Sequence, residues 1–375
     1  MTISFNRPTV TGNELRYIQE ALDKFHVSGD GMFSKRCSAW LEEEVGVRRA
    51  LLTHSCTAGL EMAALLCDLG PGDEVIMPSF TFVSTANAVV LRGAVPVFVD
   101  IRRDSLNIDE SLIEAAITPR TKAIIVVHYA GVACEMDAVM EVARRHDLFV
   151  IEDAAQALRA FYRGRPLGSI GDFAALSFHE TKNFISGEGG ALLINDTAHV
   201  ARAEILREKG TNRSSFLRGE VDKYTWVDVG SSFLPSDIIA AFLWAQFEQA
   251  ESLQAGRRAL WNRYHEGFES LEKAGAVRRP IIPDGCDHNA HLYYLLLPDL
   301  AARNRLIASL RDREIHAPFH YVPLHSAPAG LKFARTHGSL PVTDDVAARL
   351  LRMPLWHAMT KEPDQVIEAV HLLLR

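Results

Sequence analysis

Short apolar runs alternate with longer amphipathic segments through the first half of the chain, and this alternation restricts the fold more than any other feature. Apolar runs rich in β-branched residues predict strands, and helical periodicity between them predicts helices. Strands joined through helices run parallel, so a sheet covered by helices on both faces is expected. The expected strands are residues 74–77, 95–100, 123–127, 148–151 and 173–176, with helices at 110–117 and 136–146 between them.

The flanking segments extend this pattern to the ends of the chain. We expect helices at 13–25, 34–45, 55–67, 236–273, 300–313, 345–351 and 363–374, and strands at 51–53, 191–194 and 291–297. A chain of 375 residues is long enough to divide its core. The sequence therefore predicts an α/β protein in which residues 1–250 form a large domain with a mostly parallel sheet. Residues 251–375 form a smaller C-terminal α/β domain.

Polar residues follow the carboxyl ends of the predicted strands, which is where open α/β sheets bind their ligands. Lys182 lies in the segment 177–183 after strand 173–176, and Gly189 and Gly190 follow it. A lysine at a strand end can reach into a cleft, and glycines allow a close approach of the backbone. Most such lysines are simply solvated. Lys182 becomes a candidate because of other stretches upstream.

Two upstream stretches predict an anion site and a buried acid. Residues 55–59 (SCTAG) begin a predicted helix, and hydroxyls, free amides and the helix dipole favour an anion there. An ordinary Ser/Thr helix cap is the alternative. Asp153 follows Glu152 at the end of a buried strand, where a carboxylate needs a cation or a donor. Its alternative role is to cap the next helix.

A third stretch, residues 78–85, contributes aromatic side chains, of which one could cover a flat cofactor; packing in the core is the more common role. An anion cradle, an acid for a ring nitrogen, a stacking ring and a lysine amine are what pyridoxal 5'-phosphate requires. A nicotinamide cofactor is disfavoured because no G-x-G-x-x-G follows the early strands. No metal site is predicted, since His320 and His325 are five residues apart across a proline.

The net charge of −7 makes nucleic acid and anionic membrane surfaces poor partners. The longest nearly uncharged apolar run, 123–134, is too short to span a bilayer, and residues 1–11 carry no apolar run typical of a signal peptide. The five cysteines are scattered without a C-x-x-C pair, which indicates neither a disulfide framework nor a zinc site. A cytoplasmic protein without a membrane or nucleic-acid partner is therefore expected.

The chain resembles the DegT/DnrJ/EryC1/StrS sugar aminotransferases over essentially its whole length. The stretches that carry the resemblance are 28–29, 55–58, 71–76, 152–156, 177–179 with Lys182, and 187–190. The resemblance implies the fold-type-I fold of pyridoxal-phosphate-dependent transferases, which is like that of aspartate aminotransferase. It also implies a homodimer, because sites in this family are completed across the subunit interface.

By position, the resemblance implies that Lys182 is catalytic: it forms the Schiff base with the cofactor and then moves the proton. Asp153 would hold the pyridine nitrogen protonated. The remaining cofactor contacts that it implies are Gln156 beside the ring hydroxyl, Phe82 stacked on the ring, and Thr57, Ala58 and Ser177 at the phosphate. Many relatives have G-x-N-Y-R where this chain has GSSFL at 230–234. Ser232 replaces the asparagine that reaches the partner's phosphate, and the missing arginine leaves recognition of the amino donor open.

Four stretches, 126–137, 209–214, 222–226 and 319–325, resemble family members that act in enterobacterial common antigen synthesis. This implies conversion of dTDP-4-keto-6-deoxy-D-glucose to dTDP-4-amino-4,6-dideoxy-D-galactose, with L-glutamate as donor and 2-oxoglutarate as its product. The expected sugar contacts are Ser28, Gly29, His179, Arg213, Tyr321 and His325, each with a solvated or packing role as the alternative. A GDP- or UDP-linked sugar and a non-catalytic relative are the other interpretations. A dehydratase is disfavoured because such relatives carry histidine in place of Lys182.

Overall fold

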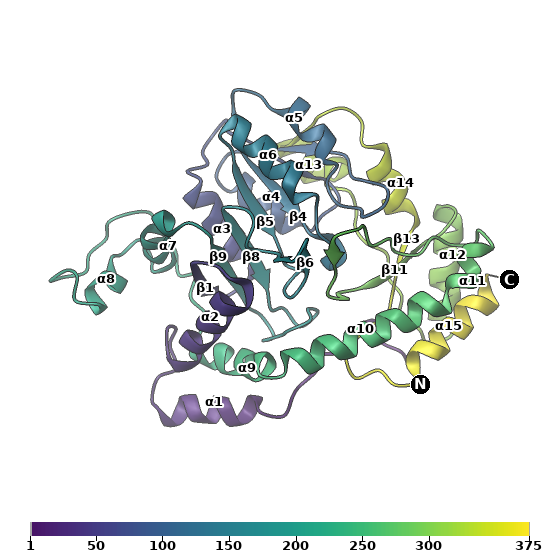
Figure 1. Cartoon of the computed structure of the whole chain (residues 1–375), viewed down its shortest axis with the longest axis horizontal. Helices are drawn as coiled ribbons and strands as arrows, with labels where there is room; N and C mark the ends of the chain where they lie inside the picture. The colour runs from purple at the N-terminus through teal and green to yellow at the C-terminus, as the bar shows by residue number, and fades with distance from the viewer. Residues whose placement is uncertain (1, 375) are drawn as a thin grey trace.

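The computed structural model of the protein describes residues 2–374, and Figure 1 shows a large sheet between helices with a smaller C-terminal layer beside it. The strands are β1 (Arg49–Thr53), β2 (Glu74–Pro78), β3 (Val95–Val99), β4 (Thr121–Val127), β5 (Phe149–Asp153), β6 (Phe161–Tyr162), β7 (Arg165–Pro166), β8 (Phe173–Ser177), β9 (Gly190–Ile194), β10 (Cys286–Asp287), β11 (Tyr293–Leu296), β12 (Arg335–Thr336) and β13 (Leu350–Met353). The helices are α1 (Glu14–Asp23), α2 (Met32–Val45), α3 (Cys56–Leu66), α4 (Val83–Val90), α5 (Ile113–Ala116), α6 (Met136–His146), α7 (Val200–Arg207), α8 (Arg213–Leu217), α9 (Asp237–Phe247), α10 (Ala250–Gly267), α11 (Glu269–Lys273), α12 (Leu300–Arg311), α13 (Pro328–Phe333), α14 (Pro341–Arg349) and α15 (Glu362–Leu373).

The large sheet has eight strands in the order β1-β9-β8-β5-β4-β2-β3-β12. Only β9 is antiparallel to its neighbours, so the sheet is mostly parallel, as predicted. Successive residues of a strand alternate between the faces: Ile124 packs with α1, α2, α6 and α9, whereas Ile125 packs with α3, α4 and α7. Burial on both faces explains the continuous apolar runs, and the α/β fold class is confirmed.

A second core lies in the C-terminal part of the chain. The antiparallel pair β11 and β13 packs against α10, α12 and α15, around aromatic residues such as Trp261, Tyr264 and Tyr293. The chain crosses between the two cores more than once: β12 pairs with β3 of the large sheet, and Ile3 bridges to Ile315 and packs in the second core. The boundary at residue 250 stays a prediction, and α10 begins there.

Two expected helices differ in the structure. The segment 236–273 forms three helices, with breaks around Gln249 and Phe268. In Figure 1 α9 and α10 follow one another along one side of the molecule. Helix α9 and the first residues of α10 pack in the core of the large sheet, and the rest of α10 packs in the second core. The expected helix 345–351 ends at Arg349, because residues 350–353 pair with β11 as strand β13. In both cases contacts with residues distant in sequence, and not the local pattern, determine where the helix ends.

Glu74 ties the edge of the large sheet together. Its carboxylate is 1 % exposed and accepts hydrogen bonds from Arg335 at 2.7 and 3.0 Å, from Arg120 at 2.6 Å and from Thr118 at 2.8 Å. Arg335 belongs to β12, so this ion pair fixes the crossing strand to the start of β2. The hydrogen bonds from Arg335 hold the pKa of Glu74 down at about 2, against the opposing effect of burial.

Glu74→Gln is expected to lower the free energy of unfolding by about 3 kcal/mol at pH 7, because it removes the buried negative charge that pairs with Arg335 and Arg120. A carboxylate with a lowered pKa stabilises the fold above its ordinary pKa of 4.5, and this stabilisation is lost as the pH falls toward 2. Urea unfolding should therefore separate wild type and variant at pH 7 and bring them together in strong acid. Glu114→Gln, at an exposed ion pair, is the control with little effect. A difference that does not depend on pH would contradict this role.

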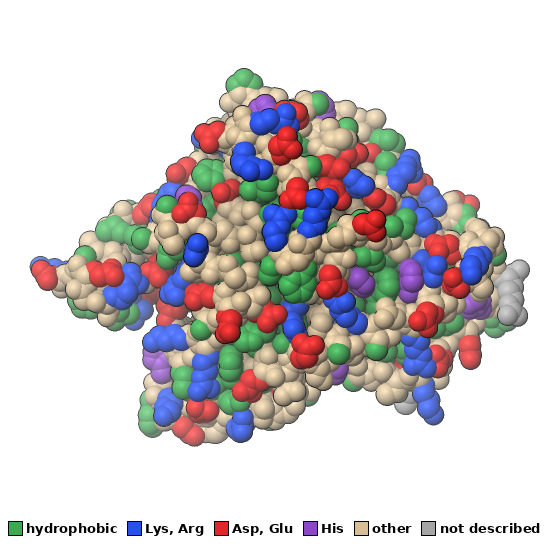
Figure 2. All heavy atoms as spheres, in the orientation of Figure 1, with side chains coloured by type: hydrophobic (Ala, Val, Ile, Leu, Met, Phe, Trp, Pro, Cys, Tyr) green, Lys and Arg blue, Asp and Glu red, His purple; other side chains and the backbone are tan. Residues whose placement is uncertain are grey.

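In residues 2–374 no helix combines the length and the apolar character needed to cross a membrane. Figure 2 shows acidic and basic side chains interspersed over one face of the molecule. In Figure 1 the α8 segment projects from the large domain, away from the other helices.

Candidate active site

A cavity of about 850 Å³ lies at the carboxyl edge of the large sheet, and residues of the C-terminal part close it from the other side. It is lined at the ends of β1, β2, β5 and β8, as expected for an open α/β sheet. The structure brings together these predicted site residues: Thr57, Phe82, Asp153, Gln156, Ser177, His179, Lys182 and Tyr321. They are far apart in sequence, and their convergence on one cavity is the first structural support for the predicted site.

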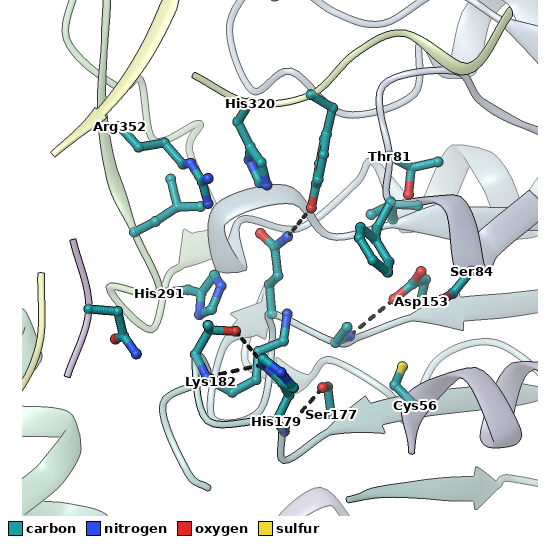
Figure 3. A pocket seen from close by; sticks show the side chains of 18 of the residues that line it. Cys56, Thr81, Ser84, Asp153, Ser177, His179, Lys182, His291, His320 and Arg352 are labelled. Carbon is teal, nitrogen blue, oxygen red and sulfur yellow. Dashed lines mark hydrogen bonds between the residues drawn. The ribbon is translucent and has the colours of Figure 1, made fainter. Parts of the chain in front are cut away.

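Lys182 lies in the loop between β8 and β9. The loop folds back on itself, with Lys182 N donating to His179 O at 2.9 Å and Ser186 N donating to Phe178 O at 2.7 Å. The lysine side chain lies in the cavity (Figure 3). Burial lowers its pKa, which favours the neutral amine that a nucleophile or base requires.

Asp153 ends β5 as a buried carboxylate without a cation. Its Oδ2 accepts a hydrogen bond from Thr85 Oγ1 at 2.7 Å, and its Oδ1 accepts one from Ala155 N at 3.2 Å. None of the ion pairs formed by residues 2–374 includes Asp153, and burial raises its pKa. A buried acid in this state fits a protonated ring nitrogen as its partner.

The preceding residue, Glu152, points to the other face of the sheet and is fully engaged. It accepts hydrogen bonds from His128 Nε2 at 2.9 Å and from the amides of Gly168, Ile170 and Gly171. These donors lower its pKa although burial opposes the shift. Glu152 therefore holds the loop before β8, and Asp153 is the carboxylate that faces the cavity.

Helix α3 begins at the opposite end of the cavity from the C-terminal residues. The first amides of a helix lack intrahelical acceptors and favour an anion. Thr57 Oγ1 lies 2.7 Å from Ser84 Oγ, and both side chains face the cavity together with Ser177. A Cβ at Gly190 would lie 2.4 Å from Cys56 N, so this position requires glycine for the close packing of β9 against the start of the helix.

A comparison with protein families matches residues 8–371 to the DegT/DnrJ/EryC1/StrS aminotransferase family. The chain belongs to this family. The spore coat polysaccharide biosynthesis protein SpsC of Bacillus subtilis is 34% identical over 100% of this chain and 97% of its own. The GDP-perosamine synthase of Caulobacter vibrioides is 35% identical over 90% of this chain and 91% of its own. The pyridoxal-phosphate form of the putative sugar aminotransferase Spr1654 from Streptococcus pneumoniae superposes with a TM-score of 0.91 at 27% identity, covering 100% and 99% of the two chains.

The protein is therefore a pyridoxal-phosphate-dependent sugar aminotransferase of fold type I, as the sequence predicts. The chemistry of the cavity fits this cofactor, because an unpaired buried acid, a buried lysine amine and a helix start with hydroxyls face one space. The comparisons do not single out the enterobacterial common antigen enzymes: the relatives named above bear the names spore coat polysaccharide biosynthesis protein and GDP-perosamine synthase. Individual residue roles in this aminotransferase stay predictions.

Gln156 and Tyr321 connect the two sides of the cavity. Gln156 Oε1 accepts a hydrogen bond from Ala130 N at 2.7 Å, and its Nε2 donates one to the Tyr321 hydroxyl at 3.0 Å. Phe82 is 58 % exposed, and its ring centroid lies 6.5 Å from that of Tyr321. An exposed ring at the rim of a cavity is free to stack on a flat ligand.

Ala58 does not line the cavity, because its side chain is buried in the core behind α3. Its amide donates to Ser55 Oγ at 3.1 Å, which makes Ser55 the cap of the helix. Ser55 is therefore an ordinary helix cap, which is the alternative that we considered for the stretch 55–59. Direct contact between the Ala58 amide and a phosphate stays a prediction. In this structure the Ser55 hydroxyl occupies that amide.

The structure places five other predicted site residues outside the cavity, namely Ser28, Gly29, Arg213, Ser232 and His325. His325 is held by Ser79, whose Oγ lies 2.8 Å from Nδ1 and accepts the amide of His325 at 2.9 Å. Gly29 packs against Leu234, where a Cβ would meet a methyl carbon at 2.6 Å. Within one chain Gly29 and His325 therefore have structural contacts, whereas Ser28 is exposed to solvent. These are the packing and solvated roles that the sequence left open.

Arg213 and Ser232 belong to the projecting segment around α8. Arg213 Nη1 forms an ion pair with Glu208 at 3.0 Å, and Ser232 is exposed. Ser232 does not line the cavity of its own chain. This position is compatible with the predicted contact to the cofactor phosphate of a partner subunit. The roles of both stay predictions.

Several cavity residues were not predicted from the sequence. They are Cys56, Thr81, Ser84, Arg257, His291, His320 and Arg352, most of which line the cavity in Figure 3. His291 Nδ1 lies 2.9 Å from Asn183 Oδ1, and His320 Nδ1 lies 3.0 Å from the Tyr129 hydroxyl. Cys56 belongs to the stretch 55–59, Thr81 and Ser84 belong to the stretch 78–85, and the spacing of His320 from His325 speaks only against a metal site. Arg352 and His291 carry no local pattern, because only packing of the second core against the sheet brings them here.

Proposed function

We propose that this aminotransferase transfers the amino group of L-glutamate to the C4 ketone of dTDP-4-keto-6-deoxy-D-glucose. The products are dTDP-4-amino-4,6-dideoxy-D-galactose and 2-oxoglutarate. The observation that carries amino transfer is the presence of Lys182 and the unpaired Asp153 in one cavity. The choice of a dTDP-linked sugar is supported by the sequence stretches 126–137 and 319–325.

When bound, pyridoxal phosphate supplies an electron sink for the carbon that carries the amino group. Asp153 keeps the proton on the ring nitrogen, since a buried carboxylate is stabilised by that positive charge. Lys182, as a neutral amine, takes the proton from the donor carbon and later delivers one to the sugar carbon. Thr57, Ser177 and the start of α3 bind the phosphate, Phe82 covers the ring and Gln156 fixes its hydroxyl side. Tyr321 and His179 contact the sugar.

A GDP-linked 4-keto-6-deoxy sugar is the second candidate. It is favoured by the 35% identity to the GDP-perosamine synthase of Caulobacter vibrioides. Both candidates use the same chemistry at C4 and differ in the nucleotide and in the sugar configuration. The product in either case is an amino sugar for a surface polysaccharide, a role in keeping with the spore coat polysaccharide protein SpsC.

A homodimer is part of this proposal. The segment around α8 projects from the molecule (Figure 1) and exposes the apolar side chains Phe216, Leu217, Tyr224, Trp226, Val227 and Val229. Large exposed apolar patches mark interaction sites. A second copy would cover this patch and receive Ser232 near its own cofactor phosphate. Sedimentation equilibrium of the wild type is expected to give twice the chain mass of 41.6 kDa, and a monomer would contradict the proposal.

The substrate is tested by single-turnover spectroscopy of the enzyme loaded with the amino form of the cofactor. We expect the visible absorbance band of lysine-bound cofactor to return with dTDP-4-keto-6-deoxy-D-glucose. GDP-4-keto-6-deoxy-D-mannose is measured alongside. A return with the GDP sugar alone would keep amino transfer and reject the dTDP sugar. Purified protein that binds no cofactor would reject the function altogether.

A further inference from the structure

Arg352 reaches the cavity from the C-terminal side. It lies on β13, and Figure 3 shows it on the opposite side of the cavity from Cys56 at the start of α3. Its Nη2 donates to Phe319 O at 3.2 Å, and its Cζ lies 4.4 Å from the centre of the Phe5 ring. These contacts orient the guanidinium and leave most of its donors free.

The positive charge of Arg352 has no ion-pair partner among residues 2–374. None of the ion pairs formed by residues 2–374 includes it, and its buried Nε has no acceptor. Burial raises the pKa of Tyr129 and Tyr321 and lowers the pKa of His291 and His320, so these neighbours are neutral. A cation that is partly withdrawn from water and has no partner is unfavourable, and Arg352 is only partly exposed. The cavity is therefore built to receive an anion at this point.

The other arginine of the cavity, Arg257, also forms no ion pair with residues 2–374, but more of its guanidinium is already bonded. Its Nε and Nη2 donate to the carbonyl oxygens of Ala290 and His291. Of these two arginines, Arg352 is thus the one with only a single nitrogen engaged in a hydrogen bond. Its planar fork matches a carboxylate with two parallel hydrogen bonds.

We propose that Arg352 binds the α-carboxylate of the amino donor. This assignment rests on the proposed amino transfer, in which the donor carbon must reach Lys182. The α-carboxylate is one bond from that carbon, whereas the diphosphate of a nucleotide sugar is attached at C1, across the sugar ring from C4. Arg352 is close enough to Lys182 for its charge to lower the lysine pKa. The cofactor phosphate is assigned to the distant end of the cavity, at α3.

This proposal supplies the donor contact that the sequence left open. The relatives with G-x-N-Y-R carry an arginine in the loop where this chain has Leu234. Here Leu234 lies outside the cavity, and the cation comes from the C-terminal part of the chain instead.

The test compares the holoenzyme with Arg352→Gln and Arg352→Lys. Isothermal titration calorimetry with glutarate is expected to show a dissociation constant about 10- to 100-fold higher in Arg352→Gln, with partial rescue in Arg352→Lys, because a hydrogen bond to a charged group is lost. The first half-reaction with L-glutamate should lose kcat/KM by a similar factor. The second half-reaction, from enzyme loaded with the amino form of the cofactor and a keto sugar, should be unchanged.

Two donor analogues identify which carboxylate is bound. L-norvaline keeps the α-carboxylate and lacks the γ-carboxylate, so its reaction should be slowed by Arg352→Gln as much as that of L-glutamate. 4-Aminobutyrate lacks the α-carboxylate, so its reaction should be unaffected. The matched control is Arg303→Gln, since Arg303 also stacks on an aromatic ring, that of Phe319, and bonds a carbonyl, but lies outside the cavity.

A loss confined to the second half-reaction would overturn the proposal and assign Arg352 to the sugar diphosphate. Equal loss in both half-reactions with a lower melting temperature would overturn it in favour of a structural role. If the wild type catalyses neither half-reaction, the proposed function fails. Calorimetry then decides about Arg352 alone: glutarate binding that depends on Arg352 supports the carboxylate site, and its absence in the wild type contradicts it.

Discussion

Replacement of Lys182 by alanine is expected to lower amino transfer by more than about 10³-fold. The side chain is the buried amine of the cavity, and a positioned general acid or base contributes about 10²- to 10⁴-fold to such a reaction. The variant should also lose the visible band of lysine-bound cofactor, because no other lysine lines the described cavity. Both effects are measured on purified protein, by stopped-flow spectroscopy and by an absorbance spectrum.

The control for this variant is Lys273→Ala. Lys273 is exposed at the end of α11, where it pairs with Glu269 at 3.1 Å on the helix surface. We expect its activity and spectrum to match those of the wild type. A Lys182→Ala protein that keeps turnover and the absorbance band would remove Lys182 from the reaction.

Asp153→Asn is expected to lower kcat by about 10³-fold while the fold is preserved. The amide has the shape of the carboxylate and still accepts the hydrogen bond from Thr85, but it carries no charge to hold a proton on the ring nitrogen. The electron sink is then weakened in both half-reactions. Stopped-flow measurement of each half-reaction, with the absorbance maximum of the bound cofactor as a second readout, tests this.

The control for Asp153→Asn is Asp172→Asn. Asp172 is a partly buried carboxylate whose pKa is raised by burial, as that of Asp153 is, and its Oδ2 accepts a hydrogen bond from the amide of Val150 at 2.7 Å. It precedes β8 and so lies at the opposite edge of the sheet from the cavity. We expect this variant to keep its half-reaction rates. Equal losses in the two variants would show that Asp153 acts through stability.

The sequence predicted the large sheet and its binding edge because both follow from local patterns. The strand runs and the residues directly after them, such as Asp153 and Lys182, are adjacent in sequence, and parallel topology brings strand ends together. The same period of two places Glu152 and Asp153 on opposite faces. The sequence pattern does not say which of these two carboxylates lies toward the ligand. That is decided by the amide donors around Glu152, which come from the loop at residues 168–171.

The contributions of the C-terminal part could not be predicted in this way. Arg352 and His291 reach the cavity through the packing of the second core, and no spacing or motif in the sequence links them to Lys182. The break at Gln249 and the strand β12 have the same origin, since each is decided by contacts with elements distant in sequence. The roles of Ser28, Arg213 and Ser232 would depend further on the partner subunit of the homodimer that we propose.

The chain crosses between the two cores, and this limits how far they can separate. Moving the second core away from the large sheet would break the pairing of β12 with β3, the Glu74–Arg335 ion pair and the bridge between Ile3 and Ile315 or the segment that follows it. We therefore expect the cavity to keep its shape during the reaction. The proposed donor and sugar would then exchange one after the other through the opening where the exposed Phe82 lies.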